Sequence, residues 1–227
     1  MIKVLFLFLA AIVALGLVFW LIVLPWSHRR GATDEEVKGP LPGDELVPSP
    51  RTGYTQAITI DAPAAEVWPW LVQHGYKRAG FYSHEWVYQL MGSNDYYEGT
   101  RSAERIIREL QDLKIGDEIK INDVSPFEVV ALEPARVLAL LARSNLETGE
   151  SFELSGPLPA KYMNQSWVYL LREIDQNRTR LIVRWRGDYS PSFANSLFFG
   201  MSVEAGAVLM QYKMLQGIRE RAEEQAR

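Results

Sequence analysis

The chain has 227 residues, of which 48% are hydrophobic and 23% charged, a balance typical of a protein that folds around an apolar core. Its formal net charge of −4 and its lack of a Lys/Arg block exclude a nucleic-acid partner, because clustered basic side chains supply phosphate affinity. The absence of cysteine excludes disulfides, thiolate nucleophiles and cysteine-ligated metal sites.

The first predicted element is a membrane helix within residues 1–30. Val4 to Leu24 carry no charge, and their insertion into a bilayer is favourable by about 5 to 9 kcal/mol. The run is about 31 Å long as a helix, which matches a hydrocarbon core of ~30 Å. A cleaved signal peptide is the alternative, but its apolar region spans only about 7–15 residues. We therefore expect an uncleaved, single-pass anchor.

Residues 31–53 contain four prolines and four glycines, with few large apolar side chains. This composition predicts an extended, mobile linker between the anchor and a globular domain at 54–227. Lys3 on one side of the anchor opposes Arg29 and Arg30 on the other, so the positive-inside rule leaves the side of the domain open.

The domain begins with a β-prone stretch at 54–60, followed by two short helices at 64–73 and 84–92. Asp61 and Ser83 are the expected N-caps of these helices. A helical turn is expected at 105–114. The chain then reads mostly as strands separated by turn signals, which favours an antiparallel meander, with a weaker strand at 150–154.

The last predicted strand alternates between two kinds of side chain. Leu181, Val183 and Trp185 fall on one face, and the other carries Arg180, Arg184, Arg186 and Ile182. This alternation predicts one buried face and one face open to water. From Ser192 onward apolar residues recur every three to four positions, which predicts a long C-terminal helix covering the concave face of the sheet.

Three separated segments carry a resemblance to a known superfamily: GYKRAGFYSHEW at 75–86, SAERIIRELQDLKIGDEI at 102–119 and SVEAGAVLMQYKMLQGIRERAE at 202–223. Together with the element order they resemble the SRPBCC, or START-like, superfamily of polyketide cyclase/dehydrase and lipid-transport proteins, and within it a bacterial branch. The resemblance spans about residues 54–224. It implies an α+β helix-grip fold, in which a curved antiparallel sheet wraps around the C-terminal helix. Relatives usually carry EPGH where this chain has Glu204-Ala205-Gly206-Ala207, so a role for that histidine does not transfer.

The resemblance also implies a cavity between the sheet and the C-terminal helix, mostly apolar with a few polar groups. Aromatic residues near its expected entrance and inward positions of the strands and the last helix are the candidate ligand-binding residues. They are Tyr76, Phe81, Tyr82, Trp86, Trp167, Trp185, Met201, Glu204 and Val208. For the tryptophans on the strands, plain core packing is the alternative.

Glu204 is the best candidate for chemistry, because helical spacing from Met201 and Val208 puts it beside the stripe that faces the sheet. A carboxylate there needs a partner, and Arg184, Arg186 or the hydroxyls of Tyr76 and Tyr82 are the candidates. Three readings stay open. The carboxylate is a structural ion pair, a polar anchor for a ligand head group, or a general acid or base.

We expect no metal and no cofactor. His74 and His84 lie ten residues apart without an HxxxH or HxH pattern, and a metal site needs three or four ligands. His84 reads as a rim or packing residue. The sequence contains no GxSxG, no glycine-rich phosphate loop and no paired-carboxylate motif, which excludes the common hydrolase, kinase and dinucleotide-dependent classes.

The leading hypothesis is a binding or carrier domain that holds a hydrophobic small molecule or lipid, tethered to the bacterial cell membrane by its N-terminal helix. The alternative is a metal-free enzyme of the cyclase or dehydratase type that acts on a polyketide-like or other apolar substrate in the same cavity. A third reading is a protein-interaction module whose cavity has collapsed.

Overall fold

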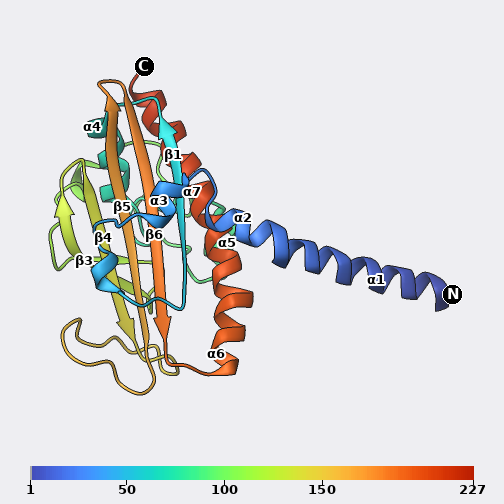
Figure 1. The fold of residues 1–227 in the computed structure, drawn as a ribbon. Coiled ribbons are helices and arrows are strands. Elements are labelled where there is room, and N and C mark those ends of the chain that lie inside the picture. The colour runs from blue at the N-terminus through green and yellow to red at the C-terminus, as the bar shows by residue number, and fades with distance from the viewer. Residues whose placement is uncertain (1) are drawn as a thin grey trace.

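The computed structural model describes residues 2–227, apart from the side chains of Ile2, Leu5, Met201 and Ser202. It has an α+β body from which one long apolar helix projects (Figure 1). In chain order the elements are α1 (Ile2–Val18), η1 (Phe19–Val23), α2 (Leu24–His28), α3 (Asp34–Lys38), η2 (Asp44–Leu46), β1 (Thr52–Ile60), α4 (Ala64–Gln73), α5 (Glu85–Leu90), η3 (Arg108–Leu110), β2 (Glu118–Lys120), β3 (Pro126–Glu133), β4 (Val137–Ser144), β5 (Met163–Asp175), β6 (Arg178–Tyr189), α6 (Phe193–Phe198), η4 (Phe199–Val203) and α7 (Glu204–Gln225).

The projecting helix consists of α1, η1 and α2. The stretch from Phe6 to His28 is long and apolar enough to cross a membrane, a property that it shares with signal sequences. Its last turns belong to the body: Leu24 and Ser27 are buried, and Trp20 packs against the core. The amide Nε2 of Gln56 on β1 donates to the Ser27 carbonyl at 2.8 Å and to the Val208 carbonyl on α7 at 2.8 Å. One buried amide thus joins α2, β1 and α7.

A single antiparallel sheet forms the body, with strand order β1-β6-β5-β4-β3-β2. The expected antiparallel arrangement is confirmed. Leu181, Val183 and Trp185 of β6 face the core beneath α7, as their alternation predicts. The expected strand at 150–154 differs, because only Ser151 pairs there, in an isolated bridge to Ser144.

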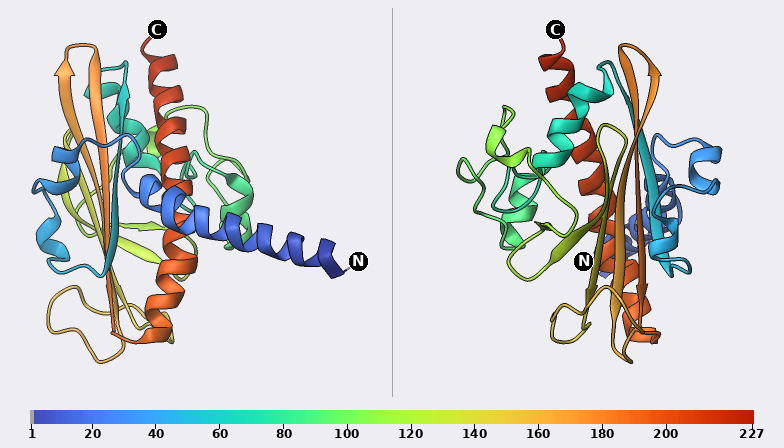
Figure 2. Two further views of the ribbon diagram at one scale, coloured as in Figure 1. Left: turned by 45° about the vertical axis from the view of Figure 1, so that its right-hand side comes forward. Right: turned by 90° about the vertical axis from the view of Figure 1, so that its left-hand side faces the viewer.

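The opposite face of the sheet is covered rather than wet, and this corrects the expectation of an extended linker at 31–53. These residues fold back over the outer face (Figure 2, right view) and contain α3 and η2. Glu36 on α3 binds Arg180 of β6, with 2.7 Å between Oε2 and Nη2. Asp44 pairs with Arg184 and Arg186 at 2.6 and 2.7 Å. The glycine and proline content did not predict that this segment is ordered, because its order comes from ion pairs between positions more than 130 residues apart.

Two expected helix caps are absent. Pro63, which has no capping side chain, precedes α4, so Asp61 does not cap that helix. α5 begins after His84, and the Ser83 hydroxyl instead donates to the Met210 carbonyl of α7 at 2.7 Å. Ser83 thereby ties the loop before α5 to the C-terminal helix. The expected turn at 105–114 shortens to η3.

The predicted C-terminal helix is confirmed: α6, η4 and α7 run on without a break from Phe193 to Gln225. Val208, Met214, Leu215, Ile218 and Ala222 are buried against the sheet and α4. Gly217 lets α7 approach the Tyr82 loop closely. A Cβ there would lie 2.1 Å from the Tyr82 carbonyl oxygen.

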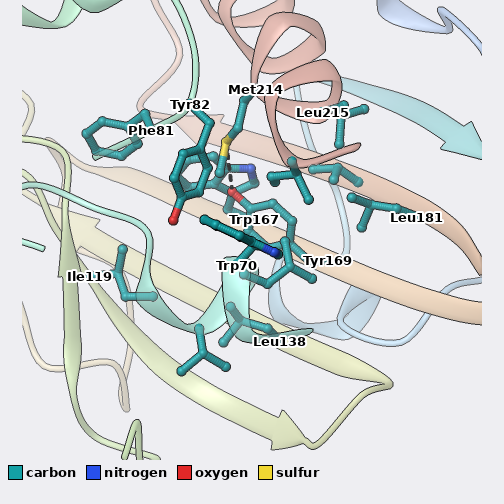
Figure 3. Close-up of a cluster of buried hydrophobic side chains, with 14 of the residues drawn as sticks. Trp70, Phe81, Tyr82, Ile119, Leu138, Trp167, Tyr169, Leu181, Met214 and Leu215 are labelled. Carbon is teal, nitrogen blue, oxygen red and sulfur yellow. Dashed lines mark hydrogen bonds between the residues drawn. The ribbon is translucent and has the colours of Figure 1, made fainter. Parts of the chain in front are cut away.

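The dense core fills only part of the space between sheet and helix. Around Tyr169, large side chains from α4, the 75–86 segment, the strands and the second half of α7 interdigitate (Figure 3). The Tyr169 hydroxyl donates to Met214 Sδ at 3.6 Å in this cluster. The interior beneath the first half of α7 is hollow.

Candidate functional site

A cavity of about 430 Å³ lies between the sheet, α5 and the first half of α7. This volume falls in the usual range for small-molecule sites, roughly 300–1,000 Å³. It is lined by Tyr54, Val87, Tyr88, Met91, Ile121, Phe127, Gln165, Trp167, Trp185, Val203, Gly206, Ala207, Met210 and Gln211. None of these side chains carries a formal charge at neutral pH, so the lining favours an apolar ligand.

The wall on the sheet side is aromatic. The Tyr54 and Trp185 rings are paired in register on β1 and β6 and stack with centroids 5.6 Å apart. Trp167 on β5 is paired in register with Trp185 and meets Phe127 on β3 edge-on, with centroids 5.8 Å apart. The indole Nε1 of Trp167 donates to Gln211 Oε1 at 2.8 Å, which satisfies the buried N–H and holds the ring in place. Small residues face this wall from the helix, because α7 contributes Gly206 and Ala207.

Besides Gln211, three residues of the lining carry polar side chains that face the cavity: the hydroxyls of Tyr54 and Tyr88 and the amide of Gln165. Burial raises the pKa of both tyrosines above the ordinary value, and the charge of Glu204 raises that of Tyr54 further. Both hydroxyls therefore stay protonated at physiological pH and can donate to a polar atom of a ligand.

A second compartment of about 310 Å³ continues from the first. The two share Met91, Ile121, Phe127, Gln165 and Val203 in their walls. The second compartment extends past Phe198 and Phe199 toward the loop after β4. Together they give an apolar channel between the α5 rim and the α6 rim.

Among the candidate residues, Trp167 and Trp185 line the cavity, while the four from the 76–86 segment do not. Phe81 and Tyr82 are core residues (Figure 3): Phe81 stacks on Tyr88 at 4.1 Å, and the Tyr82 hydroxyl accepts from Gln73 Nε2 at 3.0 Å. Tyr76 donates its hydroxyl to Asp123 near the surface at 3.1 Å. Trp86 on α5 is 64% exposed. This segment therefore supports the cavity from behind, because its Phe81 stacks on the lining residue Tyr88 of α5.

Glu204 has a partner that sequence reasoning missed. Its Oε1 lies 3.4 Å from Nε2 of His28 at the end of α2, and its side chain is 12% exposed. None of the four expected partners reaches it: Arg184 and Arg186 bind Asp44, and the hydroxyls of Tyr76 and Tyr82 are bonded elsewhere. The carboxylate thus lies at the junction of the projecting helix and α7, outside the residues that line the cavity.

The two remaining candidates on the C-terminal helix are Val208 and Met201. Val208 is fully buried in the core and contributes to the packing of α7 on the sheet rather than to the lining. The side chain of Met201 lies outside the part of the chain that the structure describes.

His74 is a buried packing residue. Its Nδ1–H donates to the Leu71 carbonyl at 2.5 Å, and Nε2 lies 3.4 Å from the Tyr169 hydroxyl. Its ring also meets Phe81 and Trp167 edge-on. Burial lowers the pKa of His74 to about 4, which keeps the imidazole neutral at physiological pH. Within the described residues, no three His, Cys, Asp or Glu side chains gather in a way that would hold a metal ion.

Sequence reasoning missed Tyr54, Tyr88, Gln165, Met210 and Gln211. The alternation of side chains along β1 predicts that Tyr54 faces inward, because Tyr54 falls on the same face as Ile58 and Ile60, which are buried in the core. Tyr88 gives no such signal, because its position depends on where the short helix α5 docks.

Neither protein-family models nor curated protein sequences match this chain. Among solved structures, it is similar to a hypothetical protein from Helicobacter pylori, with 12% identity, a TM-score of 0.45 and coverage of 81% of this chain and 95% of the other. CalU16 from Micromonospora echinospora has 16% identity and a TM-score of 0.34, with 76% and 84% covered. DynU16, from the dynemicin biosynthetic locus, has 18% identity and a TM-score of 0.37, with 74% of this chain and 47% of DynU16 covered.

Proposed function

We propose that the chain is a membrane-anchored domain of the START-like, helix-grip type that holds a hydrophobic small molecule or lipid in the cavity beneath α7. The observation that carries this proposal is the lining. It combines an uncharged aromatic wall with the polar groups of Tyr54, Tyr88 and Gln165. A ligand that fits it is mostly apolar and presents one or two polar atoms, at least one a hydrogen-bond acceptor, to Tyr54 and Tyr88.

The end of the projecting helix supports an uncleaved anchor over a signal peptide. Leu24 and Ser27 are buried in the body, and the carbonyl of Arg30 accepts from the backbone N–H of Ala57 at 3.2 Å. Cleavage after this helix would remove packing and hydrogen bonds from the domain itself. A retained helix keeps the cavity at the surface of the bilayer in which an apolar ligand dissolves.

Binding is favoured over cyclase or dehydratase chemistry because the candidate base does not line the cavity. Glu204 pairs with His28, and the described lining of the first compartment contains no Asp, Glu, His or Lys. General acid–base catalysis needs a group within hydrogen-bond reach of the substrate. We expect Glu204→Gln to leave ligand occupancy unchanged. An enzyme that depended on this carboxylate would instead lose turnover of its substrate and accumulate it.

The test is to identify what the full chain retains when it is purified from its host with a styrene–maleic acid polymer, which avoids detergent in the cavity. Organic extraction and mass spectrometry should recover a stoichiometric apolar molecule. Ala207→Trp fills the cavity and should abolish retention, whereas the same substitution at exposed Ala226 should not. Equal amounts of apolar molecules from all three proteins would overturn the proposal, since membrane lipid carried along by α1 does not depend on Ala207.

A further inference from the structure

The length of the apolar helix determines how close the body lies to a bilayer. A span of ~30 Å needs about 20 residues at 1.5 Å per residue. Counted from Val4, the first residue after Lys3, such a span ends at Val23. Trp20 and Leu24 already pack against the body at this end, while Leu21 and Ile22 between them remain exposed. A bilayer that covers the span therefore reaches the surface of the body without a gap.

Two apolar ridges lie on the side of the body from which this helix projects. Figures 1 and 2 place α5 and α6 on that side, and β3 and β4 on the other. Trp86 and Leu90 of α5 are four residues apart and share one helix face, as do Phe193 and Leu197 of α6. Leu90 is 79% exposed and Phe193 is 85% exposed.

These ridges lack the charges that a water-facing surface normally carries. No charged residue occurs between Tyr189 and Val203, a stretch that includes all of α6, or between Trp86 and Asn94 on α5 and the following turn. Exposed large apolar side chains that gather on one side of a body without charges point to an interaction site.

The ridges also form the rims of the cavity. Met91, at the end of α5, is exposed and lines both compartments, and Phe198, at the end of α6, is exposed and lines the second. The openings of the apolar channel therefore lie on the same side of the body as the projecting helix.

We propose that Trp86, Leu90, Met91, Phe193, Leu197 and Phe198 form a docking face that lies in the interfacial region of the bilayer that α1 spans. The bilayer is the occupant because α1 holds it against this side of the body, whereas a second copy would have to displace it. The cavity rims then contact lipid, and an apolar ligand enters without crossing water. This proposal rests on the membrane anchor of the proposed function.

The natural lack of cysteine allows a direct test with single-cysteine variants carrying a spin label. The full chain is reconstituted in vesicles of phosphatidylethanolamine and phosphatidylglycerol. Labels at Leu90→Cys and Leu197→Cys report the docking face, and Ile12→Cys reports the anchor. Ile174→Cys, also an exposed apolar position but at the end of β5, is the matched control. Collision of each label with oxygen, which concentrates in lipid, is compared with collision with a water-soluble nickel chelate.

We expect the labels at 12, 90 and 197 to favour oxygen and the label at 174 to favour the nickel chelate. If 90 and 197 behave like 174 while 12 favours oxygen, the docking face is wrong and the anchor stands. If 12 also favours the chelate, the anchor of the proposed function fails with it. Spin–spin broadening at Leu90→Cys that disappears on dilution with unlabelled protein would assign the face to a second copy and overturn the proposal.

Discussion

The histidine buried beside Tyr169 shows how one side chain can give the fold a pH dependence. Among the described residues, the His74 ring contacts a carbonyl, a hydroxyl and aromatic rings, and the nearest charge that acts on it is that of Arg78, which is of the same sign as a protonated imidazole. Its pKa of about 4 in the folded state lies below the ordinary 6.5, because burial disfavours the charged form. The unfolded chain therefore binds a proton between these values that the folded chain does not, and stability must fall as the pH falls through this window.

We predict that the free energy of unfolding drops by about 2 kcal/mol through His74 between pH 7.5 and 5, at 1.36 kcal/mol per pKa unit. His74→Gln should be less stable at pH 7.5 but should lose this part of the pH dependence. Urea unfolding followed by tryptophan fluorescence at the two pH values measures both. Equal pH slopes for the two proteins would show that folding does not lower the pKa of His74.

At the scale of elements, the segment at 31–53 behaves as part of the domain. The Thr33 hydroxyl accepts from the Glu36 N–H at 3.2 Å, and Glu36 Oε2 accepts from the Thr33 N–H at 2.8 Å, which forms a capping box at α3. The side-chain hydrogen bond from Arg180, followed by the backbone bond from Thr33, lowers the pKa of Glu36, so this carboxylate is charged where it meets β6.

Glu36→Gln should destabilise the protein by about 3 kcal/mol, because removing one partner of a largely buried ion pair leaves the Arg180 charge uncompensated. Glu35→Gln, at the exposed neighbouring position of α3, is the control and should change stability by less than about 0.5 kcal/mol. Denaturation midpoints measure the difference. Equal midpoints for the two variants would mean that the segment is not held on the sheet.

The contact between α7 and the Tyr82 loop depends on one glycine. A methyl group at Gly217 would meet the Tyr82 carbonyl, and backbone on both sides leaves little room for adjustment. We expect Gly217→Ala to cost about 1–3 kcal/mol through overpacking, seen as a fall in melting temperature. Gly200→Ala in η4, where a Cβ meets no atom of the described residues within 4 Å, should not lower it. A tolerated Gly217→Ala would show that α7 sits farther from this loop.

At the scale of the whole molecule, the projecting helix and the body share one core. Removal of residues 2–19 should leave a domain of nearly unchanged stability, because Trp20, Leu24 and Ser27 remain. Removal of residues 2–30 should lower the free energy of unfolding by about 3 kcal/mol. Roughly 2 kcal/mol comes from the burial of Leu24 and roughly 1 kcal/mol from the hydrogen bond from Gln56 to Ser27. Urea unfolding of the two truncated proteins compares them. Equal stability would mean that α2 is only a tether.

The sequence by itself determined the features that rest on local pattern. An uncharged run from Val4 to Leu24 allows a membrane-length helix, alternation in β6 assigns Leu181, Val183 and Trp185 to the inner face, and three- to four-residue spacing predicts the C-terminal helix. These follow from backbone periodicity and hydropathy, which neighbouring residues set.

Only the tertiary structure decided what each side chain meets. It pairs Glu204 with His28, which is 176 positions earlier, and it covers the arginines of β6 with a segment whose composition predicts a loose linker. All five of Tyr54, Phe81, Tyr82, Tyr88 and Val208 are buried in one core cluster, but of these only Tyr54 and Tyr88 also line the cavity. Whether an inward-facing aromatic side chain is enclosed by the core or borders the cavity depends on how α5 and α7 dock on the sheet. The local sequence pattern does not predict the spacing between these helices and the sheet.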